Sequence, residues 1–256
     1  MSVVRATNLT KTYRSGDVEV QAVRGVDFVI EPGSFVAFVG PSGSGKSTLL
    51  NMVGCLDHPT SGKLSVLDTD VATLDRHGAA NFRGTHLGFI FQDFNLIPVL
   101  SAAENIEYPL LMVQDWPAEK RQARVAELLD AVGMADQAGK RPDQLSGGQK
   151  QRVAVARALA TRAKLVLADE PTANLDSETG RTIIELMRSL RRQQHTTFVF
   201  STHDAAVMAK SDRVIELRDG VIAADEVRQE TASQQGARPH AAGHPEPAPG
   251  ARNGRI

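Results

Sequence analysis

The chain has 256 residues, of which 41% are hydrophobic and 23% are charged, a composition typical of one large globular domain or of a domain with an added lobe. Its 29 basic and 30 acidic residues leave a formal net charge of −1, which excludes a strong overall attraction to nucleic acid or to anionic lipid. No apolar run reaches the ~18 residues that a bilayer span requires and no signal-peptide pattern occurs, so we expect a soluble cytoplasmic protein that reaches a membrane only through a partner.

The first part of the chain has strand patterns. Residues 3–30 alternate apolar and polar side chains around a polar break at residues 15–16, which predicts antiparallel strands and a hairpin. The continuous apolar run Phe35–Val39 predicts a strand buried on both faces. A glycine-rich loop follows over residues 40–45, and a helix is expected from Lys46 onward.

Helical patterns dominate the middle of the chain. Residues 70–85 have a helical pattern, and residues 87–91 predict a further short strand. From 93 to about 141 no buried-strand pattern occurs, which predicts a separate helical lobe. Another helix should begin after Ser146, a residue type that favours the N-cap, so the predicted helical subdomain covers about 93–160. We interpret four prolines as interruptions between helices: Pro98, Pro109, Pro117 and Pro142.

Strands and helices alternate again in the last third. Two further buried strands are predicted at Leu165–Ala168 and Thr197–Ser201, with helices over 177–195 and 204–210. Arg218-Asp219-Gly220 predicts the turn of a late hairpin.

This order predicts an α/β fold with a mostly parallel sheet, preceded by an N-terminal antiparallel β-subdomain and interrupted by an inserted α-helical subdomain. We predict one domain over residues 1–228. Residues 229–256 are rich in Gln, Gly, Ala, Pro and Arg, a composition that cannot bury enough apolar surface to offset the entropy of ordering, and we predict a disordered tail there.

Residues 40–47 satisfy the spacing of a phosphate-binding loop. Its glycines let backbone N–H groups curl around phosphate oxygens, and the following helix offers unpaired N-terminal donors. Lys46 brings a positive charge for the outer phosphates, and the Ser47 hydroxyl is a suitable oxygen ligand for Mg²⁺. The residues expected to bind the nucleotide are Gly40, Pro41, Ser42, Gly43, Ser44, Gly45, Lys46, Ser47 and Thr48.

A carboxylate pair follows the strand predicted at Leu165–Ala168. Burying acids at a strand end is costly unless they have partners or a function. We predict that Asp169 holds Mg²⁺ and that Glu170, one residue further on, polarises the attacking water as a general base.

Leu145-Ser146-Gly147-Gly148-Gln149 lies twenty residues before this carboxylate pair. Together with the phosphate loop and the acidic strand end, this pentapeptide resembles the signature of the ABC (ATP-binding cassette) ATPase family, and the resemblance extends from residue 1 to about 225. It implies ATP and Mg²⁺ at the site, ATP hydrolysis, and a head-to-tail homodimer in which Ser146, Gly147, Gly148 and Gln149 contact the ATP held by the other subunit.

Four other places match the family. Tyr13 resembles the aromatic residue that stacks on adenine. Gln92 resembles the glutamine that touches Mg²⁺ and the attacking water, which implies a catalytic part for it as well as for Lys46. Residues 174–176 match the loop that crosses the dimer interface. His203 matches the histidine that contacts the γ-phosphate and steadies Glu170.

Within the family, several stretches look like the cassettes of MacB-type, lipoprotein-releasing and FtsE-type membrane complexes. The resemblance implies an integral membrane permease of the MacB or FtsX kind as partner, docked on the helical lobe near Gln92 and Tyr108-Pro109-Leu110, and no nucleic acid. A regulatory ATPase that gates a membrane scaffold for cell-wall hydrolysis stays open, as does a DNA-repair type. The stretches are 54–57, 82–84, 95–98, 104–106 and 171–177.

Overall fold

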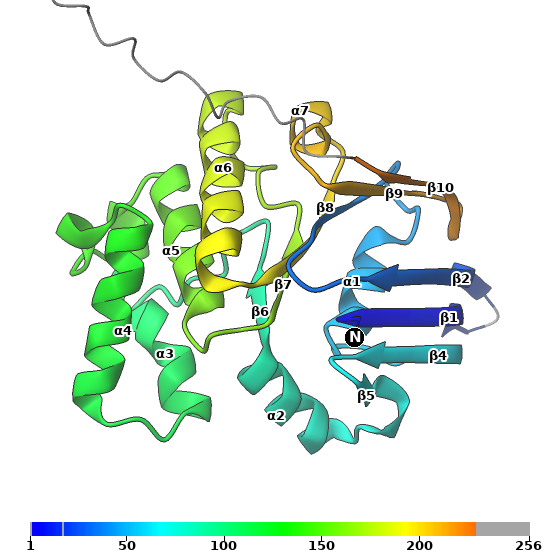
Figure 1. The fold of residues 1–256 in the computed structure, drawn as a ribbon, viewed down its shortest axis with the longest axis horizontal. Coiled ribbons are helices and arrows are strands. Elements are labelled where there is room, and N and C mark those ends of the chain that lie inside the picture. Colours follow the sequence, from blue (N-terminus) through cyan, green and yellow to red (C-terminus); the bar gives the residue numbers. More distant parts are fainter. Residues whose placement is uncertain (1, 17, 229–256) are drawn as a thin grey trace, which may run out of the picture.

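The computed structural model describes residues 2–16 and 18–228, which form two β-sheets with helices packed around them (Figure 1). The first sheet is antiparallel and has the strand order β2-β1-β4-β5. The antiparallel hairpin predicted over residues 3–30 is confirmed. The strands of this sheet are β1 (Val4–Ser15), β2 (Val18–Ile30), β4 (Ser61–Val66) and β5 (Thr69–Asp70).

The sequence pattern did not predict β4 and β5. Only Leu64 and Val66 of β4 are buried, and β5 is two residues long. So short an alternation of buried and exposed side chains is too weak to predict a strand unless the pairing strand is known. The strand exists because β1 pairs with it, as in the register Val4 to Val66.

The second sheet has six strands in the order β10-β9-β3-β8-β7-β6. All neighbouring pairs are parallel except β9 and β10, so the predicted mostly parallel sheet is confirmed. The predicted strand at 87–91 ends one residue early, at Ile90. The strands are β3 (Phe35–Val39), β6 (Leu87–Ile90), β7 (Leu165–Asp169), β8 (Thr197–Thr202), β9 (Arg213–Arg218) and β10 (Val221–Val227).

Both faces of this sheet are covered. In β3, Phe35 packs against the rings of Phe198 and Phe200, at centroid distances of 5.8 and 4.7 Å, while Phe38 on the opposite face meets Phe28 at 5.5 Å. α1 (Lys46–Val53) contributes to the core on the Phe38 side, and α6 (Ser177–Gln194) to the core on the Phe35 side. β3 is therefore buried on both faces, as predicted.

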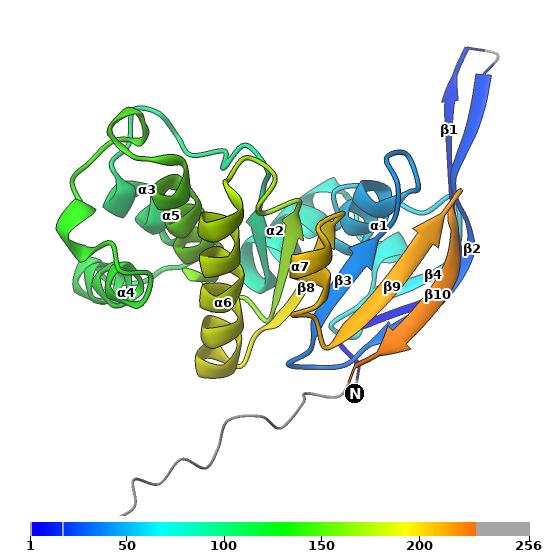
Figure 2. The ribbon, with the colours of Figure 1, turned by 90° about the horizontal axis from the view of Figure 1, so that it is seen from above.

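Three helices form a lobe at the end of the molecule away from the antiparallel sheet (Figures 1 and 2). They are α3 (Ala102–Val113), α4 (Ala118–Ala131) and α5 (Gly147–Leu159). The buried Arg124 joins two of them, because its guanidinium donates from α4 to the carbonyls of Leu159 and Ala160 at the end of α5. Along the chain, a turn of 3-10 helix at Val71–Thr73 and α2 (Arg76–His86) come between β5 and β6, and α7 (Ala205–Met208) follows β8.

Pro109 does not interrupt a helix but lies inside α3. A proline at such a position removes one backbone hydrogen bond and costs about 3 kcal/mol. Ile106 and Leu110 are fully buried beside it, and burying two such side chains contributes a comparable stabilisation of roughly 1.5–3 kcal/mol each. Tertiary packing thus overrides the local signal.

In the part of the chain that the structure describes, none of the helices combines the length and the apolar character needed to cross a bilayer. The tail predicted over 229–256 lies outside the described residues, and the proposed division into domains stays a prediction.

Gly88→Ala should destabilise the fold. An added Cβ at Gly88 would lie 2.1 Å from the carbonyl oxygen of Ala158, so β6 and α5 would have to separate. We expect the free energy of unfolding to fall by about 1–3 kcal/mol, measured by urea denaturation. Gly139→Ala is the control, since nothing lies within 4 Å of its added Cβ. Equal midpoints for the two variants would contradict the tight contact.

Candidate active site

The loop between β3 and α1 has the backbone shape of a phosphate cradle. Gly40, Gly43 and Gly45 have φ values of 143°, 79° and 103°, a region that favours glycine. A Cβ at Gly40 would also lie 2.1 Å from the carbonyl oxygen of Leu217, whereas one at Gly43 would meet nothing within 4 Å. The loop is closed by protein on one side and open on the other, where a ligand can approach its backbone.

Lys46 and Ser44 both suit an anionic ligand. The Lys46 ammonium donates to the carbonyl oxygens of Gly40 and Pro41, each at 2.9 Å, so it is held at the loop. The buried Ser44 hydroxyl has no hydrogen-bond partner among the residues that the structure describes. A buried polar group left unpaired costs roughly 1–3 kcal/mol. A phosphate oxygen would give this hydroxyl a partner, so the loop fits a nucleoside triphosphate.

The first acid lies at the carboxyl edge of the parallel sheet. One Asp169 oxygen, Oδ1, accepts hydrogen bonds from the hydroxyls of Ser47 at 3.1 Å and Ser201 at 2.6 Å. These three residues come from β7, α1 and β8. A hydroxyl and a carboxylate are ligands that Mg²⁺ accepts, and this ion keeps several waters and phosphate oxygens as further ligands. The pair therefore fits Mg²⁺, and within residues 2–16 and 18–228 no group of three or more His, Cys, Asp or Glu side chains is placed to hold a metal ion by itself.

Glu170 has an unusual backbone conformation for a residue with a side chain. Its φ is 46°, a conformation that costs of order 1–3 kcal/mol where the structure imposes it. Its N–H donates to the Ser201 hydroxyl at 2.9 Å, and its Oε2 lies 3.3 Å from Nδ1 of His203. The carboxylate is thus held beyond the strand end, as a residue that activates water must be.

Ser201 is a site residue that the sequence analysis did not select. A single hydroxyl donates to Asp169 and accepts from the N–H of Glu170, so it fastens both acids at once. The available signal was a serine at the end of a strand predicted to be buried on both faces, where a polar side chain needs partners.

Two predicted residues lie at the margins of this cluster. Tyr13, on β1, is 41% exposed and donates its hydroxyl to Asp57, a residue that the sequence analysis left without a role. Gln92, in the loop after β6, has an exposed side chain. Among the described residues, no hydrogen bond joins that side chain to Ser47 or Asp169. The metal-binding and catalytic parts assigned to Gln92 stay predictions.

The signature residues lie in a different place, at the N-terminus of α5. Ser146 caps this helix in the predicted way: its hydroxyl accepts from the N–H of Gln149 at 3.3 Å, and the Gln149 side chain accepts from the Ser146 N–H at 2.9 Å. Gly148 is required by space, since an added Cβ would lie 2.6 Å from the Thr179 side chain.

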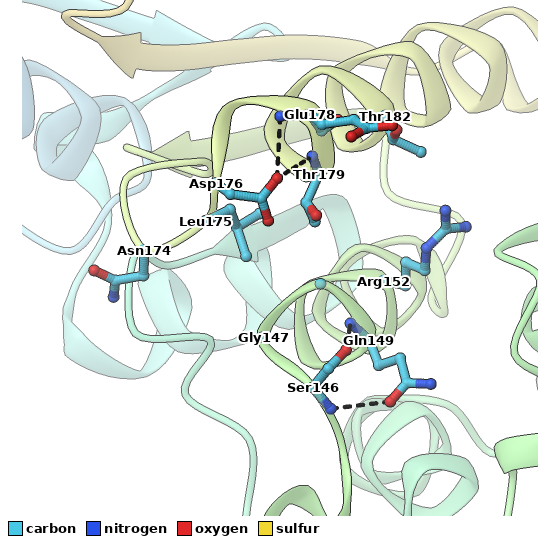
Figure 3. Close-up of a pocket in the computed structure, with 11 residues that line it drawn as sticks. Ser146, Gly147, Gln149, Arg152, Asn174, Leu175, Asp176, Glu178, Thr179 and Thr182 are labelled. Carbon is cyan, nitrogen blue, oxygen red and sulfur yellow. Dashed lines mark hydrogen bonds between the residues drawn. The ribbon is translucent and has the colours of Figure 1, made fainter.

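Ser146 and its neighbours line one side of a groove of about 490 Å³ (Figure 3). The start of α6 faces them across it, where Asp176 accepts from the N–H groups of Glu178 and Thr179 at 3.1 and 2.9 Å. Hydrogen bonds from Thr179 and Glu178 lower the pKa of Asp176, so this cap stays ionised. The N-terminus of α5 is therefore the end of this groove suited to an anion, since the Asp176 carboxylate already occupies the N-terminus of α6. None of residues 40–48 lines the groove.

The loop that contains Gln92 is fastened from two sides. The Asn174 amide donates to the carbonyl oxygen of Gln92 at 3.1 Å and to the Asp93 carboxylate at 2.9 Å. From α5, Arg157 donates to the carbonyl oxygens of Phe94 and Asn95. The loop therefore touches both the segment after β7 and the helix that begins at the signature.

The chain is similar in sequence to a known protein family. Residues 23–173 match the ABC transporter family. The chain is 45% identical over 234 residues to a macrolide export ATP-binding/permease protein, MacB, of Rhodopseudomonas palustris, a match that covers 91% of this chain and 36% of the relative. It is also 45% identical over 220 residues to an uncharacterised ABC transporter ATP-binding protein of Thermotoga maritima, of which it covers 93%. The chain thus spans about a third of the length of the MacB relative.

Solved structures with a similar fold belong to the same family. A dimeric ATP-binding cassette, MJ0796, in a post-hydrolysis state bound to ADP and Pi, superposes with a TM-score of 0.81 at 42% identity, over 88% of this chain and 99% of that one. The fold of the present chain is therefore that of a known cassette over almost all of the residues that the structure describes.

Ser201→Ala should slow turnover while sparing nucleotide binding. The hydroxyl contacts both acids but none of residues 40–46, and a buried hydrogen bond to a charged group is worth about 1.5–3 kcal/mol. We expect kcat for ATP hydrolysis to fall about tenfold or more, with the Kd for ATP changed less than about threefold. Ser189→Ala, on α6, is the control. An unchanged kcat would show that Ser201 does not hold the acids for the reaction.

Proposed function

The chain belongs to the ABC transporter family as one of its ATPase cassettes, and we propose that two copies close head to tail around two ATP molecules to drive a membrane permease. The observation that carries this proposal is the separation of the two anion-binding surfaces. The phosphate loop with Asp169 and Glu170 forms one half of a site, and the groove at Ser146 forms the other.

A second copy completes each half. In the closed pair, the triphosphate would lie between Lys46 and Ser47 of one subunit and Ser146 to Gly148 of the other. Each surface offers backbone N–H donors, and the phosphate loop adds the Lys46 ammonium. ATP would bring the phosphate oxygens that both sets of donors bind, so the closed state is stable while the γ-phosphate remains. The dimeric state of the similar MJ0796 cassette supports this arrangement.

The residues of this chain then divide the reaction between them. Lys46 and the loop N–H groups bind and orient the phosphates, and Tyr13 stacks on the base. Ser47 and Asp169 would hold Mg²⁺, which when bound neutralises charge on the phosphates. Glu170 takes the proton of the attacking water, and His203, 3.3 Å from its carboxylate, holds Glu170 in place and reaches the γ-phosphate. Loss of the γ-phosphate removes the bridge, and the subunits separate.

We place the permease on the helical lobe. A groove of about 380 Å³ between the lobe and the sheet is lined by residues of α2, β6, α3 and α5, among them Phe89 and Pro109, and by Phe91 of the loop after β6. Its lining is more apolar than that of the groove at Ser146. Arg157 and Asn95, the loop residue whose carbonyl oxygen accepts from Arg157, also line it. A permease segment seated there would sense the movement of the Gln92 loop.

The partner proposed is an integral membrane permease of the MacB or FtsX kind, with the cassette peripheral on the cytoplasmic face of the membrane. MacB and the pyoverdine export protein PvdT of Pseudomonas fluorescens, 46% identical to this chain over 235 residues, carry ATP-binding and permease parts in one protein. Export, lipoprotein release and mechanical transmission are all compatible with this partner, and so is the regulation of a cell-wall hydrolase scaffold.

A DNA-repair role is disfavoured by the lobe. Such ATPases carry a long coiled coil between phosphate loop and acidic strand, whereas residues 93–145 of this chain hold only α3, α4 and short 3-10 turns. The near-zero net charge points the same way.

Glu170→Gln should trap the closed pair. The amide keeps the shape of the side chain but cannot accept the proton, so we expect ATP to bind normally, turnover to fall by at least about 100-fold, and a dimer to accumulate with ATP on size-exclusion chromatography. Glu119→Gln, an exposed position on α4, should behave as the parent. Normal turnover, or a monomer at saturating ATP, contradicts the proposed mechanism.

Cross-linking can locate the permease. The only native cysteine, Cys55, is buried, so a cysteine placed at Tyr108, which is 41% exposed beside Pro109, gives a selective attachment point. We expect Tyr108→Cys to cross-link to a membrane permease with a large extracytoplasmic domain, identified by mass spectrometry. Lys63→Cys, on the antiparallel sheet, should not. Capture of a compact importer of many helices would contradict the MacB-type partner.

A further inference from the structure

Three side chains form a compact unit at the margin of the active site: Lys11 and Tyr13 from β1 and Asp57 from the loop after α1. The Lys11 ammonium lies 2.5 Å from Asp57 Oδ1 and donates to the carbonyl oxygen of His58 at 2.8 Å. The Tyr13 hydroxyl donates to the other oxygen, Asp57 Oδ2, at 2.8 Å. One carboxylate therefore holds both neighbours.

The protonation states of Asp57 and Tyr13 are favoured by their surroundings. Burial raises the pKa of Asp57, but hydrogen bonds from Lys11, Tyr13 and the His58 N–H outweigh it, and the pKa lies below its ordinary value. Burial and the hydrogen bond to Asp57 raise the pKa of Tyr13. The carboxylate stays ionised and the phenol keeps its proton, so the bond between them persists through the physiological range.

This arrangement fixes the Tyr13 ring in two ways. The hydroxyl is tied at one end of the ring, and the Lys11 ammonium lies over the ring at 4.9 Å from its centroid, so one face is covered. The residue is nevertheless 41% exposed. The hydrogen bond and the ammonium thus hold the ring in one rotamer and leave its other face uncovered. A flat ligand can stack on that face without further loss of side-chain entropy.

The ring is also near the phosphate loop. Thr48, two residues after Lys46 on α1, interacts with the Tyr13 hydroxyl. The chain returns from the end of the same helix to Asp57, and the N–H of Asp57 donates to the carbonyl oxygen of Asn51 within it. The base of a nucleotide whose phosphates bind at this loop would therefore lie near the ring.

We propose that Asp57 and Lys11 are positioning residues for adenine recognition, which hold the Tyr13 ring so that the base of the nucleotide stacks on its uncovered face. This inference rests on the proposed function, in which Tyr13 receives the adenine. It adds two residues that act through Tyr13 and do not touch the phosphates.

The test compares two ligands that share phosphates but differ in the base. Asp57→Asn should raise the Kd for ATP about three- to tenfold, the loss expected for one hydrogen bond, and should leave the Kd for inorganic triphosphate within about twofold of the parent. The KM for ATP should rise and kcat should stay unchanged. Glu19→Gln is the matched control, since it removes one exposed carboxylate, paired with Arg14, from the same hairpin.

A double-mutant cycle shows whether Asp57 acts through the ring. Tyr13→Phe keeps the ring but loses the hydroxyl, so adding Asp57→Asn to it should weaken ATP binding by clearly less than Asp57→Asn does alone. Additive effects, equal losses for ATP and triphosphate, or no loss at all would each overturn the inference. The proposed function fails separately, if the parent chain does not bind ATP.

Discussion

The site depends on the parallel direction of three strands. β3, β7 and β8 are neighbours that run the same way, so their carboxyl ends open on one edge of the sheet. The phosphate loop follows β3, Asp169 ends β7, and Ser201 lies near the end of β8. Only this alignment lets the hydroxyls of Ser47 and Ser201 meet on one carboxylate oxygen. An antiparallel neighbour would carry its polar end to the opposite edge.

The same edge explains why Glu170 tolerates an unfavourable backbone. A buried strand ends at Asp169, and the next residue must leave the sheet at once with its carboxylate directed outward. The N–H bond to Ser201 and the contact with His203 hold it there. These contacts offset the strain of the positive φ and hold the carboxylate in place before a ligand binds. The entropy cost of ordering the site for the reaction is therefore lower.

A second level of organisation joins the active site to the lobe. Asn174 and Arg157 bind the Gln92 loop from opposite sides, one from the segment after β7 and one from the helix that begins at the signature. Movement at either place must move this loop or break these bonds. The apolar groove between lobe and sheet touches the same loop, so in the proposed complex a partner docked in this groove would contact a segment that is bonded to the active site.

Motifs made of residues close together in the chain could be predicted from the sequence, because their function depends on neighbouring residues alone. The glycine spacing of residues 40–47, the acids after a buried strand, and the Ser146 cap each depend on residues close together in the chain. The strands Phe35–Val39 and Thr197–Ser201 were also predicted well, since a continuous apolar run indicates burial on both faces. The family resemblance then supplied the expected parts of Tyr13, Gln92 and His203.

Tertiary structure decided what depends on partners far away in the sequence. Ser47 and Asp169 are 122 residues apart and Tyr13 and Asp57 are 44 apart, and no local pattern shows that such side chains will meet. β4 depends on pairing with β1, and Pro109 lies within α3 because packing outweighs its local preference. Periodicity reports which face of an element is buried, whereas the identity of its neighbour is set only when the whole chain is packed.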